Sequence, residues 1–186
     1  EFQTDGFRLD SGNTENDNGE NFVAWQWKMN GGTTASNTDG NITSTVQANT
    51  TAGQSIVTWT GNEQSSATVG HGLSSAPELI IVKNREHGAD WAVGGDDIGS
   101  WSNQTLELNN TAAIVTDSNI FGADPTTSLF TIGTSWKTNR SSYDHIAYCF
   151  HSVTGYSKIG SYTGSGSSGN AITTGFAPAF VIVKNA

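Results

Sequence analysis

Apolar and polar residues alternate in several short runs along the chain. Residues 22–28 (FVAWQWK) and 54–60 (QSIVTWT) alternate, whereas residues 78–84 (ELIIVKN) form a short apolar run. Similar runs follow at residues 105–109, 112–116, 128–134 and 145–151. Alternation with a period of two is typical of half-buried strands, and clusters of Gly, Asn and Ser between the runs indicate turns. The pattern predicts an all-β fold, an antiparallel β-sandwich of jelly-roll or lectin-like type, because no long stretch has the period of a helix.

One of these runs occurs twice. Residues 76–85 read APELIIVKNR, and residues 177–186 read APAFVIVKNA at an offset of 101 residues. The segments before them, 53–61 and 155–164, also match each other. We expect both copies to be buried strands in similar environments, the second one within the domain or against a neighbouring copy, because a bare apolar edge promotes aggregation. Ile81 is expected to lie in the core of a central strand.

The N-terminal part of the chain has a counterpart further along. Phe7 falls on Phe130 and Ala24 falls on Ala147, both at an offset of 123 residues. Two separate runs that share one offset indicate units of about 100 to 120 residues, as in a tandem-repeat protein.

The repeat divides the chain into three parts. Residues 1–52 are expected to hold the end of a preceding repeat plus a linker. Residues 53–154 are expected to form a complete β-sandwich repeat, and residues 155–186 the start of a following repeat. The third part could fold back beside the first and complete one closed domain.

The composition predicts a surface of hydroxyl and amide groups with few charges. Only 13% of the residues are charged and the net charge is −9, which argues against a nucleic-acid or anionic-membrane partner. Six Trp, eight Phe and four Tyr supply large apolar areas for a core. No run reaches the roughly 20 apolar residues of a membrane span, so membrane insertion is not expected. The single cysteine, Cys149, excludes an internal disulfide and is expected to be a buried thiol.

Several long stretches resemble a known group of proteins. They include GENFVAWQWKMNGG, VGHGLSSAPELIIVKNR, DWAVGG, HIAYCFHSVTGYSKIGSYTGSGS and TTGFAPAFVIVKNA. These stretches resemble a repeat module of the tail fibres and related virion structural proteins of marine tailed phages. The resemblance covers almost the whole chain and implies a β-rich, repeated module without catalytic residues. The stretch HGADWAVGGDDIGSW departs from the bulkier, more aromatic run expected there.

Two tryptophans lie in polar segments between the predicted strands. Trp101 and Trp136 are expected to face solvent, and solvent-facing indoles often mark contact surfaces. Together with Asp96 and Asp97 they are the candidate ligand-binding residues, because sugars stack on exposed rings that have polar neighbours. Packing at the edge of the core is the other interpretation of both indoles, and the sequence favours it over a binding role.

The acidic residues suggest two further kinds of site. The loop at residues 10–21 fails the ligand spacing of an EF-hand and suits a polar hairpin turn. Asp96 and Asp97, with Asp90 nearby, are an alternative calcium loop, although no metal or other cofactor is expected. Glu78, Glu107, Asp96 and Asp97 are the carboxylates that a glycoside hydrolase could use, but their spacing does not distinguish them from surface charges.

We therefore expect a virion structural and adhesion module, part of a phage tail fibre or similar appendage involved in host-surface recognition. Its partners would be other copies of itself, other virion proteins and a host cell-surface glycan, and its location the virion or the extracellular space. The alternatives are a secreted carbohydrate-binding module and, less favoured, a glycoside hydrolase. An enzyme is not expected.

Overall fold

The computed structural model of the chain describes residues 3–11, 15–24, 26–29 and 33–186. Within these ranges the chain forms ten strands and no helix, which confirms the predicted all-β class. The strands are β1 (Ala35–Asn37), β2 (Ser44–Asn49), β3 (Gln54–Thr60), β4 (Ala67–Gly70), β5 (Leu79–Asn84), β6 (Ala92–Gly95), β7 (Gln104–Glu107), β8 (Val115–Thr116), β9 (Leu129–Ile132) and β10 (Asp144–Phe150).

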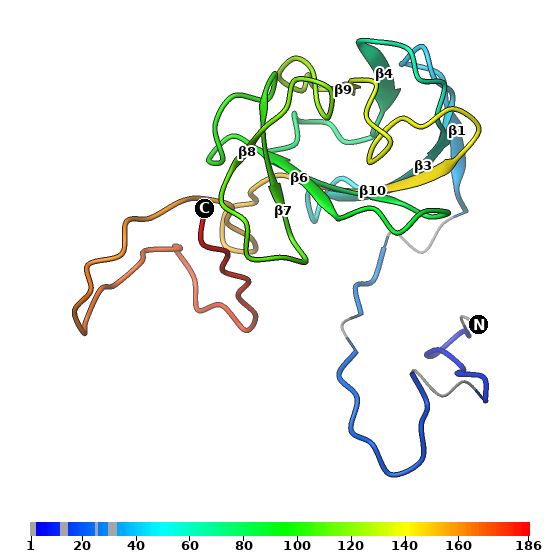
Figure 1. Cartoon of the computed structure of the whole chain (residues 1–186). Helices are drawn as coiled ribbons and strands as arrows, with labels where there is room; N and C mark the ends of the chain where they lie inside the picture. Colours follow the sequence, from blue (N-terminus) through cyan, green and yellow to red (C-terminus); the bar gives the residue numbers. More distant parts are fainter. Residues whose placement is uncertain (1–2, 12–14, 25, 30–32) are drawn as a thin grey trace.

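Eight of the strands form one antiparallel sheet, and the other two form a second. The order in the large sheet is β1-β2-β3-β10-β5-β6-β7-β8, and β4 pairs with β9 in the small sheet. The last long strand, β10, lies between β3 and β5, so that residues distant in the sequence form the centre of the sheet. Figure 1 shows the small sheet above the large one.

The three central strands follow from their alternating sequences. In β5 and β10, every second residue is buried, and β3 has nearly the same alternation. Because successive side chains of a strand point to opposite faces, one face of the sheet carries the buried set. The buried hydrophobic side chains of these strands are Val57, Trp59, Ile80, Val82, Ala147 and Cys149.

The core lies between the two sheets. Phe130 and Ile132 of β9 and Val69 of β4 belong to one buried cluster with the inward face of the large sheet. The rings of Trp59 and Phe130 meet edge to face across this layer, with centroids 5.7 Å apart. Edge-to-face aromatic pairs contribute about 0.5 to 1.5 kcal/mol beyond their buried area, so this contact ties the two sheets together.

Six of the predicted runs contain a strand in the structure, and one does not. β3, β5, β7, β8, β9 and β10 lie on or overlap the predicted runs. The run at 22–28 is the exception: residues 22–24 and 26–28 form no strand, and Val23 is 78% exposed. Its alternation is correct for a strand, but in this structure no neighbouring strand pairs with it.

β1 and β2 lie within residues 1–52, the part predicted to hold the end of a preceding repeat plus a linker. Both strands are nevertheless hydrogen-bonded into the large sheet. β2 pairs with β3 along a ladder that runs from Thr45 opposite Thr58 to Asn49 opposite Gln54, and β1 pairs with the other edge of β2. The division of the chain at residues 52/53 and 154/155 stays a prediction.

The second copy of the repeated run does not lie in the sheet. β5 is a central strand, whereas residues 179–185 form no strand, and Val181, Ile182 and Val183 are each more than 60% exposed. The prediction that the second copy is buried within the domain, in surroundings like those of β5, is therefore wrong, and the other predicted possibility, burial against a neighbouring copy, stays a prediction.

The prediction that Ile81 lies in the core is also wrong. It is half-buried on the outward face of β5, while Ile80 and Val82 are fully buried on the inward face. A run of consecutive apolar residues does not reveal which of the two faces meets the core.

Candidate functional site

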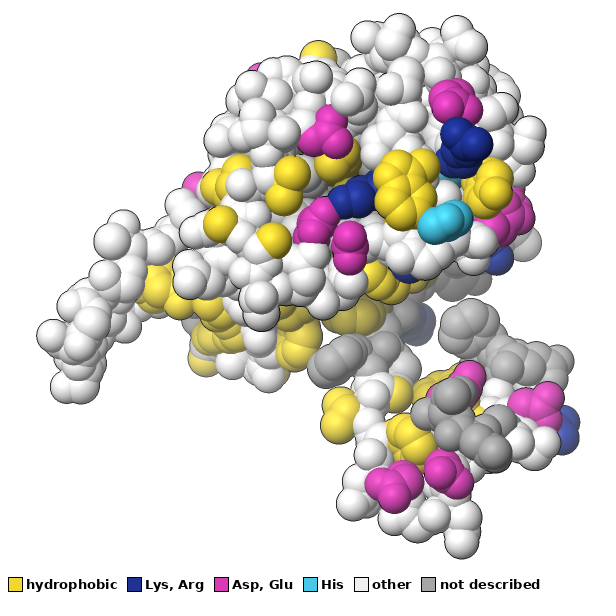
Figure 2. All heavy atoms as spheres, in the orientation of Figure 1, with side chains coloured by type: hydrophobic (Ala, Val, Ile, Leu, Met, Phe, Trp, Pro, Cys, Tyr) yellow, Lys and Arg dark blue, Asp and Glu magenta, His cyan; other side chains and the backbone are white. Residues whose placement is uncertain are grey.

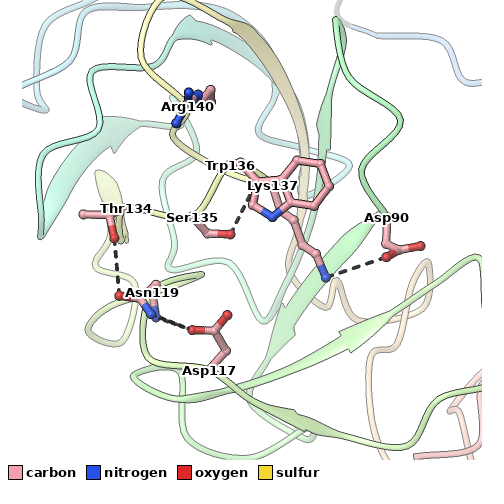
Figure 3. A pocket seen from close by; sticks show the side chains of 8 residues that line it. All are labelled: Asp90, Asp117, Asn119, Thr134, Ser135, Trp136, Lys137 and Arg140. Atoms are coloured by element: carbon pink, nitrogen blue, oxygen red, sulfur yellow. Dashed lines mark hydrogen bonds and ion pairs between the residues drawn. The ribbon is translucent and has the colours of Figure 1, made fainter.

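We call residues 35–150, which carry the ten strands, the strand-bearing part. An open groove on its surface contains Trp136, the most exposed Trp, Tyr or Phe side chain of this part. Trp136 is 44% exposed, and its ring lies between Asp90 on one side and Asn119 and Arg140 on the other (Figure 3). The groove is formed by three loops, and its lining residues are Asp90, Asp117, Asn119, Thr134, Ser135, Trp136, Lys137 and Arg140. Figure 2 shows apolar, cationic, anionic and histidine side chains gathered on this face within a largely neutral surface.

The loop that carries Trp136 is held in place by buried polar side chains. The Thr138 hydroxyl donates to the Ile120 carbonyl at 2.8 Å, and the Asn139 amide donates to the Gly133 carbonyl at 2.9 Å. Both Thr138 and Asn139 are fully buried. A tight turn closes the loop, since the Asn139 backbone N–H donates to the Ser135 carbonyl at 2.7 Å. The indole is thus presented by a backbone that is already fixed, which lowers the entropic cost of binding a ligand.

Asn84, at the end of β5, connects this loop to the central sheet. Its side-chain amide donates to the Trp136 carbonyl at 2.7 Å, and its side-chain oxygen accepts the backbone N–H groups of Glu86 and His87. Asn84 is fully buried, so all of these bonds are shielded from water. The His87 ring meets the Trp136 indole edge to face at 4.4 Å and limits its rotation.

Charged groups flank the indole on both sides. The Lys137 ammonium forms an ion pair with the buried Glu107 and lies 3.7 Å from the Asp90 carboxylate. Asn109 also donates to Asp90. On the other side, the Arg140 guanidinium meets Glu63 at 3.1 Å in an exposed pair, which contributes little stability.

Two acceptors complete the floor of the groove. Asp117 accepts the backbone and side-chain N–H groups of Asn119 at 2.9 Å, and Thr134 donates to the Asn119 oxygen (Figure 3). An exposed ring beside fixed amide, carboxylate and guanidinium groups can stack on an apolar ring face and hydrogen-bond to the hydroxyl groups around it.

Trp101, the second predicted indole, is not exposed. Only 4% of it is accessible, and its ring packs edge to face on Phe121 at 5.7 Å. A side chain at Gly94 would lie 2.4 Å from the Trp101 ring, so glycine leaves the room that the ring occupies. Of the two interpretations of Trp101, the structure therefore agrees with packing at the edge of the core and not with a solvent-facing ring.

The two predicted aspartates have separate surroundings. The Asp96 carboxylate accepts the Trp101 indole N–H at 2.8 Å, and both residues line a second hollow with Asp124. Asp97 accepts the Ser161 hydroxyl at 2.8 Å. The structure thus joins Asp96 to Trp101 but places Trp136 in a different groove.

The remaining candidate carboxylates have protein partners. Ser152 donates to Glu78, while Asn110 donates to Glu107 beside the Lys137 ion pair. Among the described residues, no group of three or more His, Cys, Asp and Glu side chains is placed to hold a metal ion. The loop at 10–21 lies partly outside the described residues.

Burial changes the acid–base behaviour of three side chains in the core. Desolvation lowers the pKa of His145, which stacks on Trp59 at 5.5 Å, against the opposing effects of the Trp136 and Tyr143 backbone. Desolvation likewise lowers the pKa of His71. Burial raises the pKa of the Cys149 thiol to about 12, which leaves it almost wholly protonated and confirms the predicted buried thiol.

The groove residues were only partly accessible to sequence reasoning. Trp136 was identified from its polar surroundings, but Asp117, Asn119 and Arg140 were not, since they carry no motif. In the sequence, Asp117 and Asn119 indicate a turn but not a place in a groove. Only the fold brings these loops together.

Comparison with known proteins places the chain in a family. The profile of the family described as "Domain of unknown function (DUF7483)" matches residues 1–186. The chain belongs to this family. No curated protein and no solved structure matches the chain. Among its described residues, no helix is long and apolar enough to cross a membrane.

Proposed function

We propose that the chain is a non-catalytic adhesion module that recognises a cell-surface glycan through the groove around Trp136. The observation that carries the proposal is the exposed indole on a loop fixed by buried Thr138 and Asn139. An exposed aromatic on a rigid frame offers contact area without a large ordering cost, which is typical of recognition surfaces.

The wider setting of the proposal is a virion appendage such as a phage tail fibre. It is supported by the resemblance of the sequence to such repeat modules and by the small share of charged residues, 13%. A surface of hydroxyl and amide groups depends little on ion pairs, which are screened at high salt. We further propose that the two packed sheets are a β-sandwich that recurs in tandem. Many weak glycan sites on one particle would then act together through avidity.

Glycan binding by the purified chain tests the proposal. An array printed at several glycan densities should show selective binding, and Trp136→Ala should weaken binding to the selected glycan by about 30-fold, the equivalent of about 2 kcal/mol. Tyr162→Ala is the matched control, because Tyr162 is also an exposed aromatic, at 50%, but lies outside the groove. Its binding should equal that of the parent.

Two results would reject glycan recognition at this groove. Absence of selective binding at every density would leave only a spacer role for the module. Equal losses for Trp136→Ala and Tyr162→Ala would mean that the groove is not where the glycan binds. Hydrogen exchange of the amides in β3 and β10 should match the parent in both variants, since neither side chain is buried against these strands.

A further inference from the structure

Exposed large apolar side chains are concentrated at the two ends of the chain. Among the described residues, Trp136 is the only one found between residues 28 and 155. The others are Phe7, Leu9, Phe22, Val23, Trp27, Tyr156, Tyr162, Ile172, Phe180, Val181, Ile182 and Val183. Contiguous apolar exposure of this kind marks a surface that another segment normally covers.

These two terminal segments carry counterparts of the central strands. The N-terminal segment matches β9 and β10, since Phe7 falls on Phe130 and Ala24 falls on Ala147. The C-terminal segment matches β3, β4 and β5 in that order. Its three matching runs are 156–163, 170–173 and 179–185.

The two sets of strands are complementary. In the strand-bearing part, β4 pairs with β9, and β10 pairs with both β3 and β5. Each of these ladders joins a strand of one set to a strand of the other. The terminal segments therefore hold the two halves of a second β3-β10-β5 sheet and of a second β4-β9 ribbon.

Several equivalent positions keep their apolar character. The partners Val69 and Phe130 of the β4-β9 ladder correspond to Ile172 and Phe7. The stacked pair Trp59 and His145 corresponds to two other aromatic residues, Tyr162 and Phe22. Several core positions are thus matched by apolar or aromatic residues in the terminal segments, whereas the buried Cys149 corresponds to Gln26.

One contact between the two segments joins residues whose counterparts face each other in the β10-β5 ladder. In the β10-β5 ladder, Phe150 lies opposite Leu79. Their counterparts are Trp27 and Phe180, and these two rings meet edge to face with centroids 6.2 Å apart. The two terminal segments also lie on the same side of the large sheet (Figure 1).

We propose that the terminal segments of one chain assemble into a second β-unit with the strand pairing of the first. In this unit, residues 22–24 and 26–28 lie antiparallel between 156–163 and 180–185, with Trp27 opposite Phe180 and Val23 opposite Lys184. The N-terminal run around Phe7 pairs with residues 170–173. The occupant of the exposed apolar surface of each segment is the other segment.

Paired cysteines test the register. Val23 and Lys184 correspond to Ile146 and Lys83, a facing pair on the outward face of β10 and β5. The double variant Val23→Cys with Lys184→Cys should form a disulfide within one chain under mild oxidation, because facing residues of antiparallel strands have Cα atoms about 4.5 to 5.5 Å apart. The control, Val23→Cys with Val183→Cys, is shifted by one residue, so its thiols point to opposite faces. Cys149 can stay, since it is buried.

Intact mass, peptide mapping and gel mobility without reductant distinguish the outcomes. A monomer linked between positions 23 and 184, formed at least about tenfold faster than in the control, supports the proposal. Equal linking in both variants would overturn it, because the contact would have no register. Linking only between two chains would overturn assembly within one chain and show exchange of strands between copies. No linking in either variant would also overturn it.

Hydrogen exchange on the unmodified chain gives an independent reading. Amides of residues 22–28 and 180–185 should exchange at least about tenfold more slowly than those of the glycine-rich loop 164–169, because paired strands open before their amides exchange. Equal exchange in all three segments would overturn the proposal even if the cysteine variants could not be prepared.

Discussion

Residues 78–84 and 179–185 have nearly the same sequence and very different surroundings. In β5, Ile80 and Val82 are completely buried between β10 and β6. Their counterparts Val181 and Val183 are 63% and 61% exposed. The apolar pattern is thus sufficient to make a segment capable of forming a strand, but the strands beside it decide whether it is buried. The two copies differ in whether neighbouring strands pair with them, and much less in their local propensity to form a strand.

The difference extends to the candidate site. Asn84 is buried at the end of β5 and holds both the Trp136 loop and the turn at 86–87. Its counterpart, Asn185, is exposed and forms no comparable anchor. The groove therefore depends on the position of β5 in the sheet, because Asn84 at the end of β5 hydrogen-bonds to the backbone of the Trp136 loop.

The largest expected effect on stability comes from placing an aspartate at one position of the repeated run, separately in each copy. Ile80→Asp should destabilise the strand-bearing part by about 4 kcal/mol or more, because an unpaired carboxylate would be buried in its central strand. Val181→Asp should change the stability of that part by less than about 0.5 kcal/mol. Hydrogen exchange of amides in β3 and β10 measures both. An Ile80→Asp protein as protected as the parent would show that β5 is not central.

A smaller effect is expected where both copies use a glycine with positive φ. Gly72 has φ +69°, and a Cβ there would lie 2.7 Å from the Val46 side chain, whereas Gly175 has φ +86° and open space around it. Gly72→Ala should cost about 2 to 3 kcal/mol, from the left-handed backbone and from crowding against β2. Gly175→Ala should leave the denaturant midpoint of the strand-bearing part unchanged. Equal shifts in that midpoint would mean that both glycines pack against it.

The parts of the fold that could be predicted are those in which alternation and burial coincide. β3, β5 and β10 were found because each buries alternate side chains beside two neighbouring strands. β4 and β6 were missed, since Gly and Ala give them little apolar contrast. Residues 22–24 and 26–28 form no strand in this structure, because alternation alone contains no information about pairing partners.

The two loop tryptophans show the same limit for the site. Trp101 and Trp136 both lie in polar sequence, and only one is exposed. Gly94 provides space for the Trp101 ring and Asp96 accepts its N–H, so that a residue with polar neighbours closes the core. These contacts link separate strands and loops, and sequence spacing does not reveal them.

The smallest predicted effect also uses the repeat. Burial lowers the pKa of His145, so the unfolded chain binds a proton at a higher pH than the folded chain does. Stability is therefore full above the unfolded value near 6.5 and decreases as the pH falls below it, with a slope of at most about 1.4 kcal/mol per pH unit for each such histidine.

The counterpart of His145 in the N-terminal segment is Phe22, which suggests a variant that keeps the stack on Trp59 but cannot titrate. His145→Phe should reduce the loss of stability between pH 7.5 and 5.5, measured by urea unfolding at each pH. The decrease should not disappear, because burial lowers the pKa of His71 as well, and Leu73 donates its backbone N–H to the ring nitrogen that protonation would occupy. An unchanged slope in His145→Phe would mean that His145 is not the group that couples protonation to folding.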